Sequence, residues 1–282
     1  MKKFMCVFEQ GKDPDELTKK HKEIFTSDFC DFYRINWHYE DKKDDPYAHI
    51  CNKGVIGTEG LSLLYETVPK DYEYYIFIDD DMDFYCPDGC DDKIVVERMR
   101  DLLLKYRPLA GTFIESQFLK DLKKHDIDTN NLKEAFVAAT WDQGVAFWHK
   151  SVAEHMFPII YHGAAGSRHY VHYCLNKLYP DKMHVYTNIR YRNLRHDREW
   201  VNPSLSQWKS KETLYHLFNR HTKDKDFHIY WTDVFWEKLL SRYYNEVSVA
   251  KDPREFKLED LAKIYDITND SYVNRTALEV KK

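Results

Sequence analysis

The stretch that decides the fold reads YYIFIDDD and covers residues 74–81. Its first five residues carry no charge, and a continuous apolar run of this kind is typical of a central β-strand that is covered on both faces. Three consecutive aspartates follow directly. Carboxylates in that position lie at the carboxyl end of a buried strand, which is the edge where open α/β sheets bind ligands. The stretch therefore predicts a buried strand that leads into a ligand site.

Strand-like and helix-like segments alternate on both sides of this stretch. Strands are expected near residues 4–8, 31–38, 109–114, 145–148 and 184–189, and helices near residues 13–25, 61–68, 91–106, 151–156 and 170–178. Such alternation predicts an α/β fold, with a mainly parallel sheet and helices on both faces. Beyond residue 211 the pattern is helical. We expect a first domain over residues 1–210 and a helical extension over residues 211–282 packed on it.

Composition and charge narrow the class of protein. The 282 residues are 43% hydrophobic and 32% charged, which suits a packed domain and excludes disorder as the main state. The formal net charge of -5 disfavours a nucleic-acid binder, because such proteins carry a basic excess. No apolar run reaches the roughly 18 to 20 residues of a membrane span, and the N-terminus lacks a signal-peptide pattern. We therefore expect a cytoplasmic protein with no membrane span.

Six cysteines are scattered over residues 6, 30, 51, 86, 90 and 174. In a chain of this length such scatter predicts reduced thiols rather than a disulfide framework. Cys86 and Cys90 are close enough to share a metal ion, but no second pair with zinc spacing accompanies them. The sequence favours free thiols at all six positions.

The aspartate cluster has the chemistry of a metal site. Asp79 and Asp81 are two residues apart, so extended backbone places both on one face. Their mutual repulsion requires a cation, and Mg²⁺ or Mn²⁺ prefers such oxygen ligands while leaving positions for phosphate oxygens. An EF-hand loop counted from Asp79 fails, because Phe84 and Cys90 stand where it needs Gly and Glu. A haloacid dehalogenase phosphatase is disfavoured, because its aspartate pair lies near the N-terminus.

The aspartate motif at residues 79–81 and the order of the expected strands and helices together resemble the GT-A glycosyltransferases over roughly residues 1–200. In that family a Rossmann-like half binds the nucleotide, an Asp-x-Asp motif ends a central strand, and a later histidine often completes the metal site. The resemblance implies that Asp79, Asp81 and His196 bind Mn²⁺ or Mg²⁺. It also implies that Asp79 and Asp80 contact the nucleotide-sugar. The implied fold is GT-A with a helical C-terminal extension.

The same resemblance assigns nucleotide contacts by position. Phe8 and Glu9 follow the first expected strand, and Asn52 and Lys53 precede the second expected helix.

A second landmark, TWDQGVAFW, covers residues 140–148. It resembles the glycine-containing loop that lies beside the donor sugar and the acceptor in GT-A enzymes. Gly144 permits close backbone approach, and Trp141 and Trp148 offer flat apolar faces to a sugar ring. Asp142 is the candidate general base for the acceptor hydroxyl if the reaction inverts the anomeric centre.

The chain departs from the family at residues 163–169, GAAGSRH, where an acidic catalytic motif often begins a helix. No carboxylate is present there. Glu115 is therefore a further candidate base, and the choice between inversion and retention stays open.

Charge is distributed unevenly along the chain. Residues 71–101 contain 11 Asp and Glu against 3 Lys and Arg, a local net charge of -8, whereas residues 182–225 contain 10 Lys and Arg against 4 Asp and Glu, a net charge of +6. If the two segments face each other, a metal and several cations surround a diphosphate and stabilise it as it departs. The candidate cations are Arg190, Arg192, Arg195 and Arg198, with Arg195 assigned to the nucleotide-sugar.

These observations predict a metal-dependent glycosyltransferase that moves a sugar from a nucleoside diphosphate sugar, first of all a UDP-sugar, to a hydroxyl of a glycan or glycoconjugate. Two alternatives stay open: a metal-dependent phosphohydrolase that uses the same aspartates, and a carbohydrate-binding protein without activity on the same fold. The expected cytoplasmic location would suit an enzyme of a bacterium or of a large DNA virus.

Overall fold

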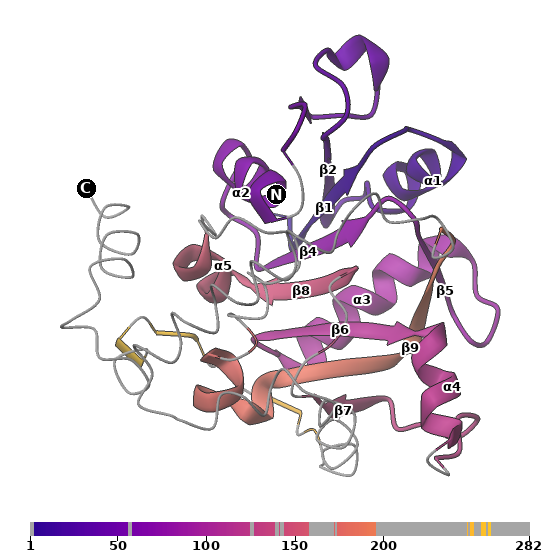
Figure 1. Cartoon of the computed structure of the whole chain (residues 1–282). Helices are drawn as coiled ribbons and strands as arrows, with labels where there is room; N and C mark the ends of the chain where they lie inside the picture. The colour runs from indigo at the N-terminus through magenta and orange to yellow at the C-terminus, as the bar shows by residue number, and fades with distance from the viewer. Residues whose placement is uncertain are drawn as a thin grey trace.

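The computed structural model describes residues 3–55, 58–124, 127–138, 141, 144–157, 172, 174–195, 247, 249–250, 255–257 and 259–260. Within them the chain forms one sheet with helices on both faces (Figure 1). The strands are β1 Met5–Gly11, β2 Cys30–Asn36, β3 Ile50–Cys51, β4 Tyr74–Asp79, β5 Met82–Tyr85, β6 Ala110–Glu115, β7 Ala135–Val137, β8 Val145–His149 and β9 Met183–Asn193. The helices are α1 Glu16–Ile24, α2 Thr58–Thr67, α3 Asp92–Tyr106, α4 Ser116–Lys124 and α5 Lys150–Met156, with 3₁₀ turns η1 Lys42–Asp44 and η2 Pro180–Lys182.

The expected α/β class with a mainly parallel sheet is confirmed. The strand order is β3-β2-β1-β4-β8-β6-β9-β5, with β7 paired to β9. Following the pairings, β1, β2, β3, β4, β6 and β9 run one way, and β5, β7 and β8 run the other. Antiparallel β8 lies beside β4 (Figure 1) and brings its own start to the carboxyl end of β4. Three short strands, β3, β5 and β7, and helix α4 were not expected.

The central strand β4 is covered on both faces, as its apolar run predicts. Tyr75 and Phe77 pack into a core with α2, α4 and α5, whereas Tyr74, Ile76 and Ile78 pack into a second core with α1 and α3. This alternation follows from the two-residue period of a strand. Because both faces are buried, a shift of one residue in register would exchange the two cores, and β4 holds one register.

Short segments near the C-terminus pack on the domain. Phe256 is 2% exposed and its amide donates to Ser151 Oγ at 2.9 Å, at the start of α5. Tyr179 Oη contacts the Asp260 carboxylate. The expected boundary near residue 210 and the helical nature of the extension stay predictions, because residues 196–246 lie outside the described ranges.

The structure also bears on the expected state of the cysteines and on the expected lack of a membrane span. Cys86 and Cys90 form a disulfide, so the expectation of reduced thiols is wrong for this pair, whereas Cys6, Cys30, Cys51 and Cys174 are not in disulfides. Cys86 and Cys90 lie on one tight turn. The scatter of the other four cysteines along the chain led to the expectation of reduced thiols. Among the described residues, no helix is both long and apolar enough to cross a bilayer.

His184 gives the sheet a pH dependence. Burial lowers its pKa to about 4 from an ordinary 6.5, so the folded chain favours the neutral imidazole. Its Nε2 contacts the Asp181 carbonyl at 2.9 Å. Because the folded pKa is depressed, the stabilisation is fully present above pH 6.5 and is lost as the pH falls towards 4.

We expect His184→Gln to remove about 3 kcal/mol of this pH-dependent stability, the equivalent of the pKa difference. Urea denaturation at pH 7 and pH 4.5 measures it. The difference in unfolding free energy between wild type and variant should shrink at the lower pH. A difference that is the same at both values would contradict the assignment.

Candidate functional site

The acidic segment, Asp79–Asp81, is held by its backbone between three strands at one edge of the sheet. The amide of its first residue donates to the Gly144 carbonyl at 3.0 Å, and the amide of its second donates to the Gln10 carbonyl at 3.0 Å. The carbonyl of its third accepts from the Leu194 amide at 2.9 Å. The segment therefore joins the end of β1, the start of β8 and the end of β9. Residues 10, 79, 144 and 194, far apart in sequence, meet here.

Asp80 is held tightly by its side chain. Its Oδ2 accepts from the Lys12 amide at 2.9 Å and lies 3.5 Å from Arg195 Nη1 and 3.8 Å from Arg34 Nη2. Only 13% of the side chain is exposed. Burial raises the pKa of this carboxyl to about 6, against the opposing effects of Arg34 and the Lys12 amide. Protein groups thus surround the middle carboxylate of the segment.

Gly11 makes room for that carboxylate. A Cβ built at Gly11 would lie 2.2 Å from Asp80 Oδ2 and 2.5 Å from Asp80 Cβ, closer than any real contact. The last residue of β1 must therefore be glycine for Asp80 to lie across the end of the strand.

We expect Gly11→Ala to cost about 1 to 3 kcal/mol of unfolding free energy, because the added methyl must displace the side chain of Asp80. Gly60→Ala within α2 is the matched control: its Cβ would lie in ordinary contact, 3.5 Å from the side chain of Ile35, and alanine in a helix stabilises by about 0.5 to 1 kcal/mol relative to glycine. Chemical denaturation distinguishes the two. Equal stability of the two variants would contradict the packing described here.

A buried polar network lies beneath Asp80. Glu9, His21, Arg34, Asn36 and Asp45 are all 0% exposed. Arg34 donates from Nη1 to the Glu9 carboxylate and from Nε to Asp45 Oδ2 at 2.7 Å. Asn36 donates to the same Asp45 oxygen at 2.8 Å. The Glu9 carboxylate also contacts His21 Nδ1.

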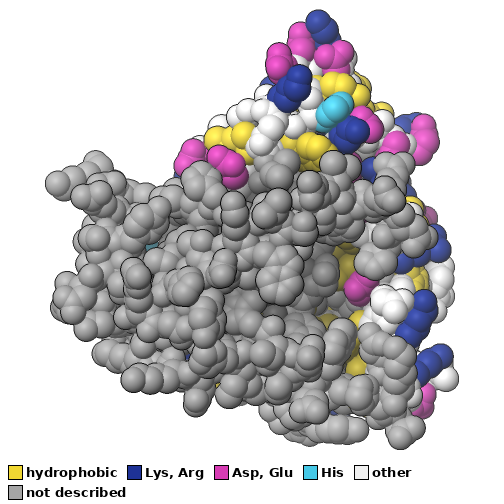
Figure 2. All heavy atoms as spheres, in the orientation of Figure 1, with side chains coloured by type: hydrophobic (Ala, Val, Ile, Leu, Met, Phe, Trp, Pro, Cys, Tyr) yellow, Lys and Arg dark blue, Asp and Glu magenta, His cyan; other side chains and the backbone are white. Residues whose placement is uncertain are grey.

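The network connects four elements to the acidic segment. Nε2 of His21, on α1, donates to the Met82 carbonyl at 2.7 Å, just beyond the segment. Asp45 directly follows η1, and the loop that carries η1 projects from the sheet and exposes acidic and basic side chains together (Figure 2). Asp45 alone among residues 42–45 is buried. Arg34 thus anchors an exposed loop, β1 and the acidic segment at once.

We expect Arg34→Leu to cost about 3 to 5 kcal/mol, because it leaves the Glu9 and Asp45 carboxylates buried without their cation. The matched control is Arg98→Leu, which breaks the exposed ion pair with Asp88 and should cost far less, because exposed ion pairs contribute little to stability. Denaturant unfolding measures both. Costs that are similar in the two variants would show that the network contributes no more than a surface pair.

Asp79 and Asp81 flank the held Asp80 and are both half-buried. Asp79 Oδ1 accepts from Gln10 Nε2 at 2.7 Å. The backbone turns at Asp80 and Asp81, so the expected extended backbone with Asp79 and Asp81 on one face is wrong. Carboxylate oxygens are the ligands that Mg²⁺ and Mn²⁺ prefer, so these two residues are the ones that could hold such an ion. Their chemistry fits a divalent cation.

Arg195, from the basic stretch 182–225, contacts the acidic segment. The two oppositely charged parts of the chain therefore approach each other here, as the charge distribution predicts. The guanidinium of Arg195 contacts Asp15 at the start of α1 as well as Asp80. Arg192 instead pairs with Asp83 at 2.7 Å and is 60% exposed. Of the four arginines named from the sequence, Arg195 is the described one that contacts the acidic segment.

Asn52 and Lys53 lie in the turn after β3, on the same edge of the sheet as the acidic segment. Both are exposed. The Asn52 amide donates to the Asn36 carbonyl at 2.9 Å, and Lys53 Nζ lies 3.7 Å from Glu40. Their position leaves them available to a ligand, and the nucleotide contact stays a prediction.

Four expected contacts need correction, because the side chains are buried. Phe8 and Glu9 are 0% exposed: the first packs in the core and the second is held by Arg34 and His21. Neither presents a surface to a nucleotide base. Trp148 is 1% exposed and packs on aromatic rings beneath β4, and Trp141 is 5% exposed. Apolar residues at strand ends are better explained as core, so neither tryptophan offers a face to a sugar.

Asp142 and His196 lie outside the described residues, as does Arg198. Their predicted roles as base, metal ligand and diphosphate contact stay predictions. Gly144 is described, and its carbonyl binds the first residue of the acidic segment.

Sequence reasoning missed most of the residues that hold the segment. These are Gln10, Gly11, Lys12, Asp15, His21, Arg34, Asn36 and Asp45. One signal was present: Arg34 is a charged residue inside the expected strand 31–38, and a charge inside a buried strand needs a partner.

Comparison by sequence finds no family and no curated relative for the chain. No family model matches the chain, and no curated protein matches it.

Solved structures match at low similarity. A glycosyltransferase involved in glycosylation of the major capsid of PBCV-1 matches with a TM-score of 0.34 and 14% identity, over 65% of this chain and 82% of that one. The inositol-1-phosphate CTP transferase of T. maritima matches with a TM-score of 0.35 and 12% identity, over 77% and 95%. A mannose-1-phosphate geranyltransferase of Thermus thermophilus matches with a TM-score of 0.34 and 9% identity, over 68% and 75%. At TM-scores this low the matches carry no argument about this chain.

Proposed function

We propose that the chain is a metal-dependent glycosyltransferase that moves a sugar from a nucleoside diphosphate sugar, a UDP-sugar, to a hydroxyl of a glycan or glycoconjugate. One observation carries the proposal. The middle carboxylate of the acidic segment is held by the protein, and the half-buried Asp79 and Asp81 precede and follow it in the chain at the carboxyl end of β4, where α/β sheets generally bind ligands.

Asp79 and Asp81 would hold Mn²⁺ or Mg²⁺, with His196 as the proposed third ligand. When bound, such an ion supplies positive charge that offsets the charge developing on a departing nucleoside diphosphate. The rigid attachment of the segment keeps these two carboxylates in place, because a metal site requires its ligands to be positioned before the ion arrives.

The remaining roles belong to neighbouring groups. Arg195 lies within 3.5 Å of Asp80 and is close enough to reach a diphosphate bound at the segment. Asn52 and Lys53 are exposed on the same edge and are the proposed nucleotide contacts. The Gly144 carbonyl accepts from the Asp79 amide, and glycine there is the proposed point of close approach for the donor sugar. Asp142 is the proposed general base.

We expect Asp81→Ala to lower metal-dependent turnover of a UDP-sugar by about a hundredfold or more, as loss of a transition-state charge partner does. The matched control is Asp101→Asn on α3, a carboxylate that is 64% exposed and should leave turnover unchanged. Release of UDP in the presence of Mn²⁺ measures both variants. Circular dichroism would check that each variant is folded.

Three outcomes would overturn the proposal. Unchanged turnover in Asp81→Ala removes the aspartates from the site. Release of pyrophosphate from a nucleoside triphosphate and a sugar phosphate makes the chain a nucleotidyltransferase, and release of phosphate from simple esters makes it a phosphohydrolase. Stabilisation by UDP with Mn²⁺, and not by GDP with Mn²⁺, in a thermal-shift measurement supports the choice of donor.

A further inference from the structure

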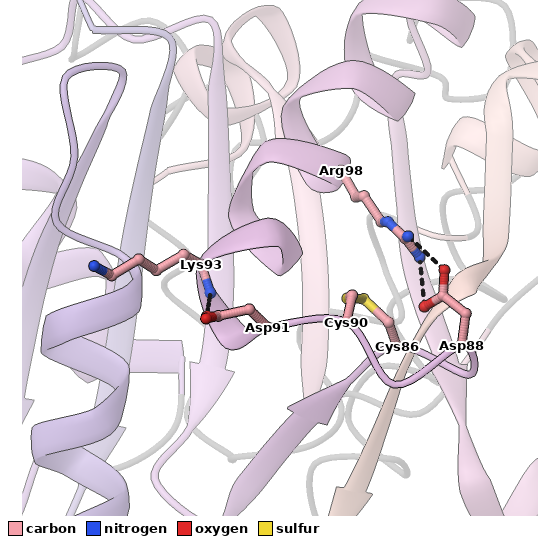
Figure 3. The surroundings of a disulfide bond; sticks show 6 residues. All are labelled: Cys86, Asp88, Cys90, Asp91, Lys93 and Arg98. Carbon is pink, nitrogen blue, oxygen red and sulfur yellow. Dashed lines mark hydrogen bonds and ion pairs between the residues drawn. A yellow bond between two sulfur atoms is a disulfide. The ribbon is translucent and has the colours of Figure 1, made fainter.

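The turn between β5 and α3 brings three metal-ligating side chains together. Cys86, Asp88 and Cys90 each offer one ligand atom, and these atoms lie within 4.8 Å of one another. No other group of three His, Cys, Asp or Glu in the described part of the chain meets this condition. Figure 3 shows the disulfide at the base of the turn and Asp88 at its tip.

A backbone hydrogen bond closes the turn in addition to the disulfide. The Gly89 amide donates to the Cys86 carbonyl at 3.0 Å, which closes a four-residue turn with Pro87 at its second position. Gly89 has φ 73, in the left-handed region that glycine adopts without strain. We therefore expect the turn to persist when the disulfide is reduced and to keep the two sulfur atoms close together.

The far end of the turn is also held independently. Asp91 caps α3, since its Oδ1 accepts from the Lys93 amide at 2.9 Å (Figure 3). From the next turns of α3, Arg98 donates to both oxygens of Asp88, with Nη1 at 3.0 Å from Oδ1. In metal sites a ligating carboxylate is usually held by such a partner. Arg98 orients Asp88 without using its remaining lone pairs.

The disulfide itself closes a small loop, because only four positions separate its cysteines. Disulfides stabilise folded proteins mainly by constraining the unfolded chain, and they do so least for short loops. Cys86 is 3% exposed, whereas Cys90 is half-buried and so within reach of a reductant. The disulfide therefore stabilises the fold little, and it is accessible to thiol–disulfide exchange.

We propose that Cys86, Asp88 and Cys90 form a redox-gated site for a thiophilic divalent cation, Zn²⁺. Oxidised, the two sulfur atoms are bonded to each other and cannot bind the ion. A dithiol reductant delivers two electrons and two protons to the bond, gives two thiols and is itself oxidised to a disulfide. Zn²⁺ then displaces both thiol protons and binds two thiolates and one carboxylate, with water as the fourth ligand.

The chemistry separates this site from the acidic segment. Two thiolates select zinc over magnesium and manganese, which prefer oxygen ligands. The site therefore stands independently of the proposed transferase function, and a failure of one leaves the other untouched.

The test uses Co²⁺ as a coloured substitute for Zn²⁺ and the full chain in its reduced and oxidised forms. Reduced protein should bind Co²⁺ with sulfur-to-cobalt charge-transfer absorption, which added Zn²⁺ abolishes. The absorption should be lost in the oxidised protein and in Cys90→Ser. Asp88→Asn should bind about tenfold more weakly, within the range seen when groups around a metal are changed. Cys51→Ser, which alters a half-exposed free cysteine, is the control and should leave the absorption unchanged.

Absence of the charge-transfer absorption in reduced wild type, or its survival in Cys90→Ser, would overturn the proposal. A measurement without variants covers the case in which Cys90→Ser does not fold. Zn²⁺ should slow alkylation of Cys90 in the reduced wild type, as read by mass spectrometry of the peptide. An alkylation rate that is the same with and without Zn²⁺ would equally contradict the site.

Discussion

The guanidinium of Arg34 lies fully buried among three carboxylates, and the arrangement of the carboxyl end of β1 and of the acidic segment depends on it. It donates to Glu9 on β1 and to Asp45 after η1, and it lies 3.8 Å from Asp80. A buried cation is tolerated only when its partners offset the lost hydration, and each of these carboxylates equally requires the cation. The geometry of three separate elements is therefore set by one side chain.

This arrangement gives the three aspartates of the acidic segment different tasks. Asp80 faces the protein, with Gly11 leaving the space that its carboxylate occupies. Asp79 and Asp81 flank it, in backbone that β8 and β9 also hold. A flexible acidic turn would have to lose conformational entropy on binding an ion, whereas a segment held on three sides has lost that entropy on folding. Burial of Asp80 in this position raises its pKa to about 6.

Much of the fold could be predicted from sequence, because its signals are local. The apolar run before Asp79 identified a central strand, and two-residue and helical periods located most of the elements around it. The short strand β5 carries no such pattern, because four residues are too few to show a period. Strand β8 was expected but not its antiparallel direction, which depends on contacts between distant segments.

The site was predicted less fully, for a related reason. Asp79 and Asp81 have a local pattern, and the charge imbalance along the chain anticipated the approach of Arg195 to the acidic segment. The residues that hold Asp80 have no pattern, since Glu9, Arg34 and Asp45 meet only after folding. Trp141 and Trp148 were assigned to a sugar because of their chemistry, but burial decides what a tryptophan contacts, and both lie in the core.

The most direct measurement is a crystal structure of the chain with Mn²⁺ and UDP, using the anomalous scattering of manganese to locate the ion. We expect the manganese peak between Asp79 and Asp81, the diphosphate on its outer side, and Asp80 still bound to the Lys12 amide. A manganese peak elsewhere would contradict the assignment of the ion to Asp79 and Asp81. A peak that Asp80 ligates after leaving its contacts with Lys12 and Arg34 would contradict the structural role of Asp80.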